Sequence, residues 1–176
     1  MKLDQRMQRI RAILSDVDGV LSDGGISYDN QGIETKKFHV RDGLGIKLWM
    51  KAGHTFGIIT ARSSHIVKLR AAELGVELVR QGSSDKLSVA QQILDELGLE
   101  MSEVCYVGDD LTDLPLLKKV GLAASVADGV EEVKEAAHFI TKKSGGQGAI
   151  RELIESVLRS QKRWSELVQH YTGGLS

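Results

Sequence analysis

The chain has 176 residues, of which 41% are hydrophobic and 27% are charged, a balance typical of a globular protein with a packed core. Its formal net charge is −1, and without a basic excess we expect neither nucleic acid nor an anionic membrane as its partner. The single cysteine, Cys105, excludes an internal disulfide framework and a cysteine-based zinc site. The first residues are polar and no stretch reaches transmembrane length, so the expected compartment is the cytoplasm.

The first part of the chain predicts a buried strand followed by a hairpin. A polar lead-in over residues 1–11 precedes an apolar strand at about 12–16. Two short strands around a turn-rich segment then predict a protruding β-hairpin at about 26–38. Asp42 is the expected N-cap of a helix at about 44–52.

From residue 55 onward, apolar strands alternate with amphipathic helices. Further strands are predicted at about 55–59, 76–79, 104–107, 122–125 and 139–140. Further helices are predicted at about 63–74, 86–97, 113–120, 131–137 and 149–160, and a polar tail at about 161–176. This alternation predicts an α/β fold, a single domain over 1–176 with a doubly wound, Rossmann-like parallel sheet and right-handed crossovers.

Polar side chains gather where the predicted strands end. Asp16 and Asp18 end the first strand, Thr60 ends the second, Lys86 begins a helix, and Asp109 follows the fourth strand. Ligands of such sheets bind off the carboxyl ends of the strands, so we expect these groups to converge. Two carboxylates two residues apart on a strand point the same way, which is costly unless a cation or a shared proton compensates, and Mg²⁺ is the natural candidate for the cation. Ordinary turn aspartates are the alternative interpretation.

This arrangement suits phosphoryl transfer. Asp16 can attack phosphorus to form an aspartyl-phosphate, and Asp18 can protonate the leaving alcohol and then activate water. Asp109 would complete a Mg²⁺ site with the Asp16 carboxylate and the Asp18 carbonyl. Thr60 and Lys86 would bind and neutralise the phosphoryl group.

Two further aspartates, Asp110 and Asp113, are assigned supporting positions beside the metal. Asp113 can hold a metal-bound water or orient Lys86. Taken singly, each of these groups has an ordinary alternative: a solvated helix lysine, an N-cap threonine or a turn aspartate.

Four segments, DVDGVLSDG, IITARSS, SDK and VGDDLTDLP, resemble the motifs of the haloacid dehalogenase-like phosphohydrolases. More narrowly, FHVRDGLGIK, QGSSDK, GDDLTDLP and GGQGAIRE are similar to segments of the 3-deoxy-D-manno-octulosonate 8-phosphate phosphatase family, over about residues 10–155. The resemblance implies Asp16 as nucleophile, Asp18 as acid and base, and Asp109 as a metal ligand with them. It also implies Thr60 and Lys86 at the phosphate. Ala61 departs from the family, where glycine usually follows the motif threonine.

The intervals between the motifs leave no room for a separate cap domain. The resemblance implies a homotetramer instead, in which the hairpin joins an intersubunit β-barrel and a neighbouring subunit helps to close the site.

The carboxylate of a sugar acid phosphate suits paired N–H donors of arginine. Arg62 is the first candidate to bind it, and Arg70, which matches a family arginine, is the second; a surface ion pair is the alternative for each of them. Gly146 and Gln147 belong to a glycine-rich loop that predicts either a lid over the site or a plain helix-entry loop.

The resemblance implies a Mg²⁺-dependent phosphatase that hydrolyses 3-deoxy-D-manno-octulosonate 8-phosphate in lipopolysaccharide precursor synthesis, and this is the leading hypothesis. A phosphatase for a nonulosonate 9-phosphate is the close alternative, although Arg62 favours the octulosonate. A non-catalytic interaction module is disfavoured because Asp16, Asp18 and Lys86 are all present. A phosphotransferase must shield its phosphoenzyme from water, which the expected lack of a cap domain disfavours.

Overall fold

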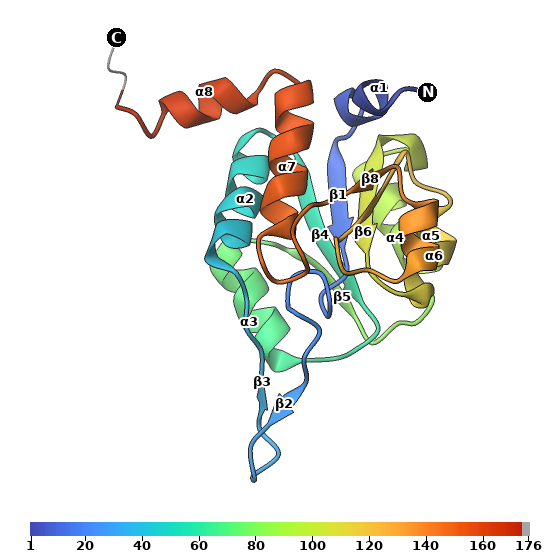
Figure 1. Cartoon of the computed structure of the whole chain (residues 1–176), viewed down its shortest axis with the longest axis vertical. Helices are drawn as coiled ribbons and strands as arrows, with labels where there is room; N and C mark the ends of the chain where they lie inside the picture. Colours follow the sequence, from blue (N-terminus) through green and yellow to red (C-terminus); the bar gives the residue numbers. More distant parts are fainter. Residues whose placement is uncertain (174–176) are drawn as a thin grey trace.

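The computed structural model describes residues 1–173 and contains one six-stranded parallel sheet in the order β5-β4-β1-β6-β7-β8 (Figure 1). Its strands are β1 (Ala12–Ser15), β4 (Thr55–Thr60), β5 (Leu78–Gln81), β6 (Val104–Gly108), β7 (Leu122–Ser125) and β8 (Phe139–Ile140). The central strand β1 pairs with β4 on one side and β6 on the other, Ile13 lying opposite Phe56 and Cys105. The chain builds one half of the sheet before it crosses to the other, which confirms the doubly wound fold and places a switch point beside β1.

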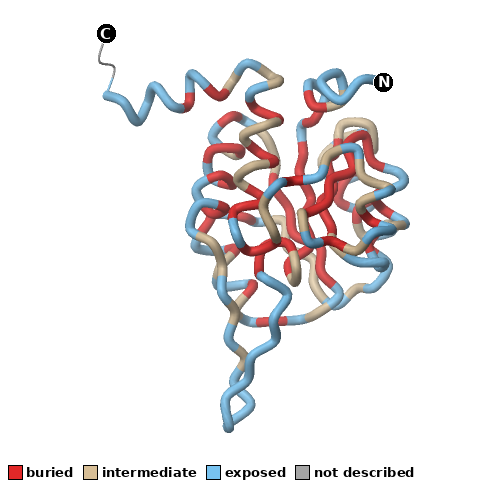
Figure 2. The backbone as a smooth tube through the Cα atoms, viewed as in Figure 1, coloured by how far each residue is buried: buried red, intermediate tan, exposed pale blue. Residues whose placement is uncertain are grey.

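Helices cover both faces of this sheet (Figure 1). One face packs against α2 (Val40–Lys51), α3 (His65–Leu74) and α7 (Ala149–Ser160), and the other against α4 (Lys86–Leu97), α5 (Leu114–Leu117) and α6 (Glu131–Ala136). Within β1, Ile13 joins the first core while Ala12 and Leu14 join the second, so the whole strand is buried (Figure 2). This two-sided burial explains the continuous apolar run of the strand.

The helices α4 and α7 have the bounds that the sequence predicts, because their apolar periodicity is strong. In α7 the apolar side chains recur at the spacing of one helix face, and all are buried: Ile150, Leu153, Ile154, Val157 and Leu158. The predicted helix at 113–120 is shorter, because a 3₁₀ turn at Leu111–Asp113 precedes α5. A second 3₁₀ turn, Met101–Glu103, leads into β6. Within the described chain, each helix is too short or too polar to cross a membrane.

Both ends of the chain hold a short helix that the sequence analysis missed. The expected lead-in contains α1 (Leu3–Gln8), which buries Met7, and the expected polar tail contains α8 (Trp164–Gln169). Trp164 is buried, with the guanidinium groups of Arg151 and Arg159 of α7 lying 4.9 and 5.4 Å from its ring centre. The tail therefore docks on its own chain through Trp164; its last part, 174–176, lies outside the described residues.

The predicted hairpin is present, with strands β2 (Ser27–Tyr28) and β3 (Glu34–Thr35) that are shorter than expected. The Asp29 carboxylate accepts hydrogen bonds from the N–H groups of Gln31 and Ile33, which closes the turn. The hairpin projects beyond the carboxyl ends of the sheet strands and is largely exposed (Figures 1 and 2). Among residues 1–173, the segments that join β1, β4 and β5 hold this hairpin, α2 and α3, and none forms a cap domain.

Helix α2 corrects the prediction for Asp42. The helix begins at Val40, and His39 is its N-cap, accepting a hydrogen bond from the Arg41 N–H. Asp42 is buried within the helix and accepts hydrogen bonds from the N–H groups of Gly148 (3.2 Å) and Arg151 (2.7 Å), so it caps α7 instead. The predicted start was too late because Gly43 resembles a helix breaker. A Cβ at Gly45 would lie 3.2 Å from the Arg151 Cα, so glycine permits α2 and α7 to pack closely.

Candidate active site

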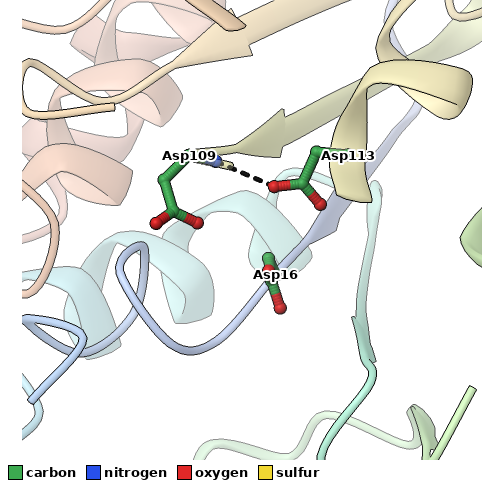
Figure 3. A group of neighbouring side chains, drawn as sticks. All are labelled: Asp16, Asp109 and Asp113. Carbon is green, nitrogen blue, oxygen red and sulfur yellow. Dashed lines mark hydrogen bonds between the residues drawn. The ribbon is translucent and has the colours of Figure 1, made fainter. Parts of the chain in front are cut away.

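Three carboxylates meet at the carboxyl ends of β1 and β6 (Figure 3). Asp16 directly follows β1, Asp109 directly follows β6, and Asp113 ends the 3₁₀ turn beyond it. One carboxylate oxygen of each residue lies within 4.8 Å of the others. The convergence predicted for Asp16 and Asp109 is therefore present in the structure.

Lys86, the first residue of α4, lies between two of these carboxylates. Its Nζ donates to Asp16 Oδ2 and to Asp113 Oδ1, both at 2.6 Å, and its side chain is only 2% exposed. The structure thus brings Lys86 to Asp16, as the sequence predicts.

Asp113 is the buried anchor of this group. Besides Lys86, it accepts hydrogen bonds from the Tyr106 hydroxyl (2.6 Å) and from the N–H groups of Asp109 (2.9 Å) and Asp110 (3.2 Å). Sequence reasoning missed Tyr106, because it occupies an apolar strand and resembles a core residue; only its hydroxyl, which needs a partner when buried, signals the contact.

Burial and mutual repulsion shape the charges of the cluster. Burial, with the Asp113 charge, raises the pKa of Asp16 to about 6. Burial, with the charges of Asp113 and Asp16, raises the pKa of Asp109 to about 7. Burial alone would lower the pKa of Lys86, but Asp16 and Asp113 raise it overall. The cluster of three carboxylates and one ammonium therefore disfavours full ionisation without a further cation.

The cluster fits a divalent cation. Oδ1 of Asp109 is buried and has no hydrogen-bond donor within residues 1–173. Carboxylate oxygens are the ligands that Mg²⁺ prefers, and a cation here would relieve the repulsion that raises these pKa values. Gly19, whose Cβ would lie 2.0 Å from Asp109 Oδ2, leaves room for this carboxylate.

Asp18 is held apart from the three carboxylates. Strand β1 ends at Ser15, so Asp16 and Asp18 lie in the following turn and do not share one strand face as expected. The Asp18 carboxylate instead forms ion pairs with Lys36 Nζ and with Arg62 Nε, the latter at 3.4 Å.

The root of the hairpin supplies partners that sequence reasoning missed. Glu34 accepts from Arg62 Nη2 at 2.9 Å and from the Ser64 hydroxyl at 2.7 Å, and it lies 3.3 Å from Lys36 Nζ. We call Asp18, Glu34, Lys36 and Arg62 the hairpin-root cluster. The available signal was the spacing of Glu34 and Lys36, which puts two residues of an extended segment on the same face.

Comparisons with known proteins identify the family of this chain. A family model described as haloacid dehalogenase-like hydrolase matches residues 70–153. The 3-deoxy-D-manno-octulosonate 8-phosphate phosphatase of Yersinia pestis is 42% identical over 159 residues, which cover 90% of this chain and 85% of that protein. The chain belongs to the 3-deoxy-D-manno-octulosonate 8-phosphate phosphatase family.

Solved structures of this phosphatase family are similar to this chain over nearly its whole length. The enzyme of Moraxella catarrhalis, in complex with a magnesium ion, a phosphate ion and a KDO molecule, superposes with a TM-score of 0.94 at 40% identity and covers 96% of this chain and 97% of its own. The cobalt-bound form of the Haemophilus influenzae phosphatase has a TM-score of 0.89 at 37% identity, covering 92% and 94%. The family resemblance expected from the sequence is confirmed.

The contacts of Thr60 and Gly146 lie with Arg62 and with the turn after β1. Thr60 ends β4, is buried, and accepts a hydrogen bond from the Arg62 N–H at 3.4 Å. The Gly146 N–H donates to the Val20 carbonyl at 2.9 Å, so the glycine-rich loop packs on the turn that carries Asp18. Gln147 follows in the same loop.

Arg70 contacts a different part of the protein from the other candidate residues. It is on α3, where it pairs with Glu73 at 2.8 Å and lies 5.8 Å from the ring centre of Phe38. Together with Phe38 and Gly43 it lines a small, mostly apolar cavity between α2 and α3. The contacts of Arg70 thus connect it to these two helices and not to the carboxylate cluster.

Proposed function

We propose that this chain is a Mg²⁺-dependent phosphatase that hydrolyses 3-deoxy-D-manno-octulosonate 8-phosphate to the free sugar acid and phosphate. The observation that carries the proposal is the buried Asp16–Lys86–Asp113 group with Asp109 beside it, in a member of this phosphatase family. The magnesium, phosphate and KDO bound by the Moraxella catarrhalis enzyme support the same choice of metal and substrate.

The proposed reaction has two steps. The Asp16 carboxylate attacks phosphorus, the bond from phosphorus to the sugar oxygen breaks, and that oxygen takes its proton from Asp18. A water molecule then gives a proton to Asp18 and attacks the aspartyl-phosphate, which releases phosphate and restores Asp16. The Lys86 ammonium offsets charge on Asp16 and the phosphoryl group, and Thr60 donates to a phosphoryl oxygen.

Asp16, Asp109 and the Asp18 carbonyl would hold Mg²⁺, with Asp110 and Asp113 in supporting positions. When bound, the ion supplies positive charge that stabilises the transferring phosphoryl group. Within residues 1–173, Asp109 Oδ1 has no hydrogen-bond donor, and burial above all raises the pKa of Asp109; both observations support this assignment.

Arg62, Arg70, Gly146 and Gln147 are the proposed substrate-binding residues. Support is strongest for Arg62, whose partly exposed guanidinium lies at the hairpin root close to Asp18. It is weaker for Arg70, whose nearest partner is Glu73. The packing of Gly146 on the turn after β1 supports a role for its loop at the edge of the site.

We also propose a homotetramer in which the hairpin contacts neighbouring subunits. Three large apolar side chains of the hairpin, Ile26, Tyr28 and Ile33, are each more than half exposed, which favours a protein partner over water. A cytoplasmic location and a place in lipopolysaccharide precursor synthesis remain predictions.

The proposal is tested by phosphate release in the presence of Mg²⁺ from octulosonate 8-phosphate, a nonulosonate 9-phosphate and hexose phosphates. We expect a strong preference for the octulosonate. Asp16→Asn removes the nucleophile and should lower kcat at least about 10³-fold, whereas the exposed Asp95→Asn should leave it unchanged. Preference for the nine-carbon sugar would contradict the substrate, and near-normal turnover by Asp16→Asn would contradict the mechanism.

A further inference from the structure

Lys36 is a buried cation on an otherwise exposed hairpin. Its side chain is 0% exposed, and its Nζ contacts Asp18 Oδ1 and lies 3.3 Å from Glu34 Oε1. Burying an ammonium is costly unless carboxylates compensate, and a hairpin root could bury an apolar side chain more cheaply. The position therefore requires an explanation beyond hairpin stability.

The partners of Lys36 lie on the substrate side of the proposed phosphate site. Asp16 faces Lys86 and Asp113, whereas Asp18 faces Lys36 and Arg62. The leaving oxygen of a sugar phosphate lies between phosphorus and the sugar, so it would lie between these two sets of residues. Asp18 is thus held on the side where a proton must be delivered.

We infer that Lys36 is a positioning residue that holds the Asp18 carboxyl for proton transfer to the leaving sugar oxygen. This inference rests on the proposed function. Lys36 fixes Oδ1 while Arg62 approaches Oδ2, so the carboxyl is restrained from two sides. Lys36 itself neither gains nor loses a proton: the proton moves from Asp18 to the sugar oxygen as the phosphorus–oxygen bond breaks, and water later restores it.

Glu34 holds Lys36 and Arg62 in this arrangement. A hydrogen bond from the Ser64 hydroxyl, with those from Arg62 and Lys36, lowers the pKa of Glu34, so the group remains ionised near neutral pH. Glu34 therefore restrains both of the cations that contact the Asp18 carboxyl.

The test compares two substrates that differ in their need for a proton. The leaving group of the sugar phosphate is an alcohol, which needs the proton. The leaving group of 4-nitrophenyl phosphate is a stable phenolate, which does not. In Lys36→Met we expect kcat/KM for the sugar phosphate to fall about 10- to 100-fold, in line with the loss of general-acid catalysis, and that for the aryl phosphate to fall less than about 3-fold. The control, Lys51→Met, removes an exposed lysine from the end of α2, outside the hairpin, and should leave both values unchanged.

The ratio of the two kcat/KM values is independent of how much of the preparation is folded, because both substrates report on the same active fraction. Lys36→Arg retains the cation and should recover part of the ratio. Equal losses on both substrates in Lys36→Met, with an active wild-type chain, would overturn the positioning role alone. A wild-type chain that hydrolyses neither substrate would overturn the proposed function and, with it, this inference.

Discussion

Four aspartates of the site have the same side chain and different neighbours. Asp16 faces an ammonium, Asp113 accepts from four donors, and Asp18 lies between two cations. Asp109 has a buried oxygen that finds no donor in the described part of the chain. Environment, not residue type, decides whether a carboxyl attacks, supports, binds metal or transfers a proton. The proposed division of roles follows these neighbours.

At the scale of one residue, Gly19 should be necessary for metal binding. Its φ is +88°, and a Cβ there would lie 2.0 Å from Asp109 Oδ2, so Gly19→Ala must displace the proposed metal ligand. We expect the Mg²⁺ concentration for half-maximal phosphatase activity to rise at least about 10-fold, as a loss of about 1.4 kcal/mol of binding free energy would give.

Gly53→Ala is the matched control for this substitution. Gly53 has a φ of +86°, and no atom of residues 1–173 lies within 4 Å of its Cβ position, so alanine there adds only the left-handed backbone strain of about 1–2 kcal/mol. It should lower the unfolding midpoint without changing the Mg²⁺ dependence. An unchanged Mg²⁺ dependence in a folded Gly19→Ala would contradict the assignment of Asp109 as a ligand.

At the scale of elements, Asp42 joins α2 to the start of α7. Asp42→Ala leaves the N–H groups of Gly148 and Arg151 without their acceptor inside the protein. We expect the free energy of unfolding in urea to fall by about 1–3 kcal/mol. Asp42→Asn keeps one acceptor oxygen and should lose less; an equal loss in both variants would show that the negative charge, not the hydrogen bond, matters.

Elements with a strong local pattern are the ones that the sequence predicts well. Helix α7 presents a continuous apolar face, and its bounds agree with the prediction. In contrast, α1 and α8 were missed because each buries few side chains, chiefly Met7 and Trp164, too few to give a periodic signal. The start of α2 was misplaced because Gly43 resembles a helix breaker, although in the structure it lies within the helix and faces Arg70 and Leu74 of α3.

The site also contains residues whose positions a local pattern predicts and residues whose contacts it does not predict. The positions of Asp16, Asp109 and Lys86 could be predicted, because parallel strands place their carboxyl ends along one edge. The contacts of Lys36 and Glu34 could not be predicted, since they depend on where the base of the hairpin lies relative to Asp18 and Arg62. Those contacts join segments that no local pattern relates.

At the scale of the whole molecule, the proposed metal site couples stability to pH. Asp16 and Asp109 have ordinary pKa values of 3.8 that burial, with repulsion from Asp113, raises to about 6 and about 7 in the folded chain. At pH values between the ordinary and the raised pKa of each group, the metal-free folded state holds protons that the unfolded state has released. The stability of the metal-free protein should therefore decrease as pH rises from about 4 to about 7.

Magnesium should reverse this loss, because it binds the ionised carboxylates and competes with protons. At about 100 times its Kd, a ligand stabilises by about 2.7 kcal/mol, which corresponds to about 5–10 °C in Tm for a chain of this size. We expect a shift of this size when Mg²⁺ is added at about pH 8 and one below about 2 °C at about pH 5, measured by thermal unfolding. Asp109→Asn removes one of the titrating ligands and should abolish most of the shift at the higher pH. Equal Mg²⁺ shifts at the two pH values would mean that the ion binds elsewhere than at these two carboxylates.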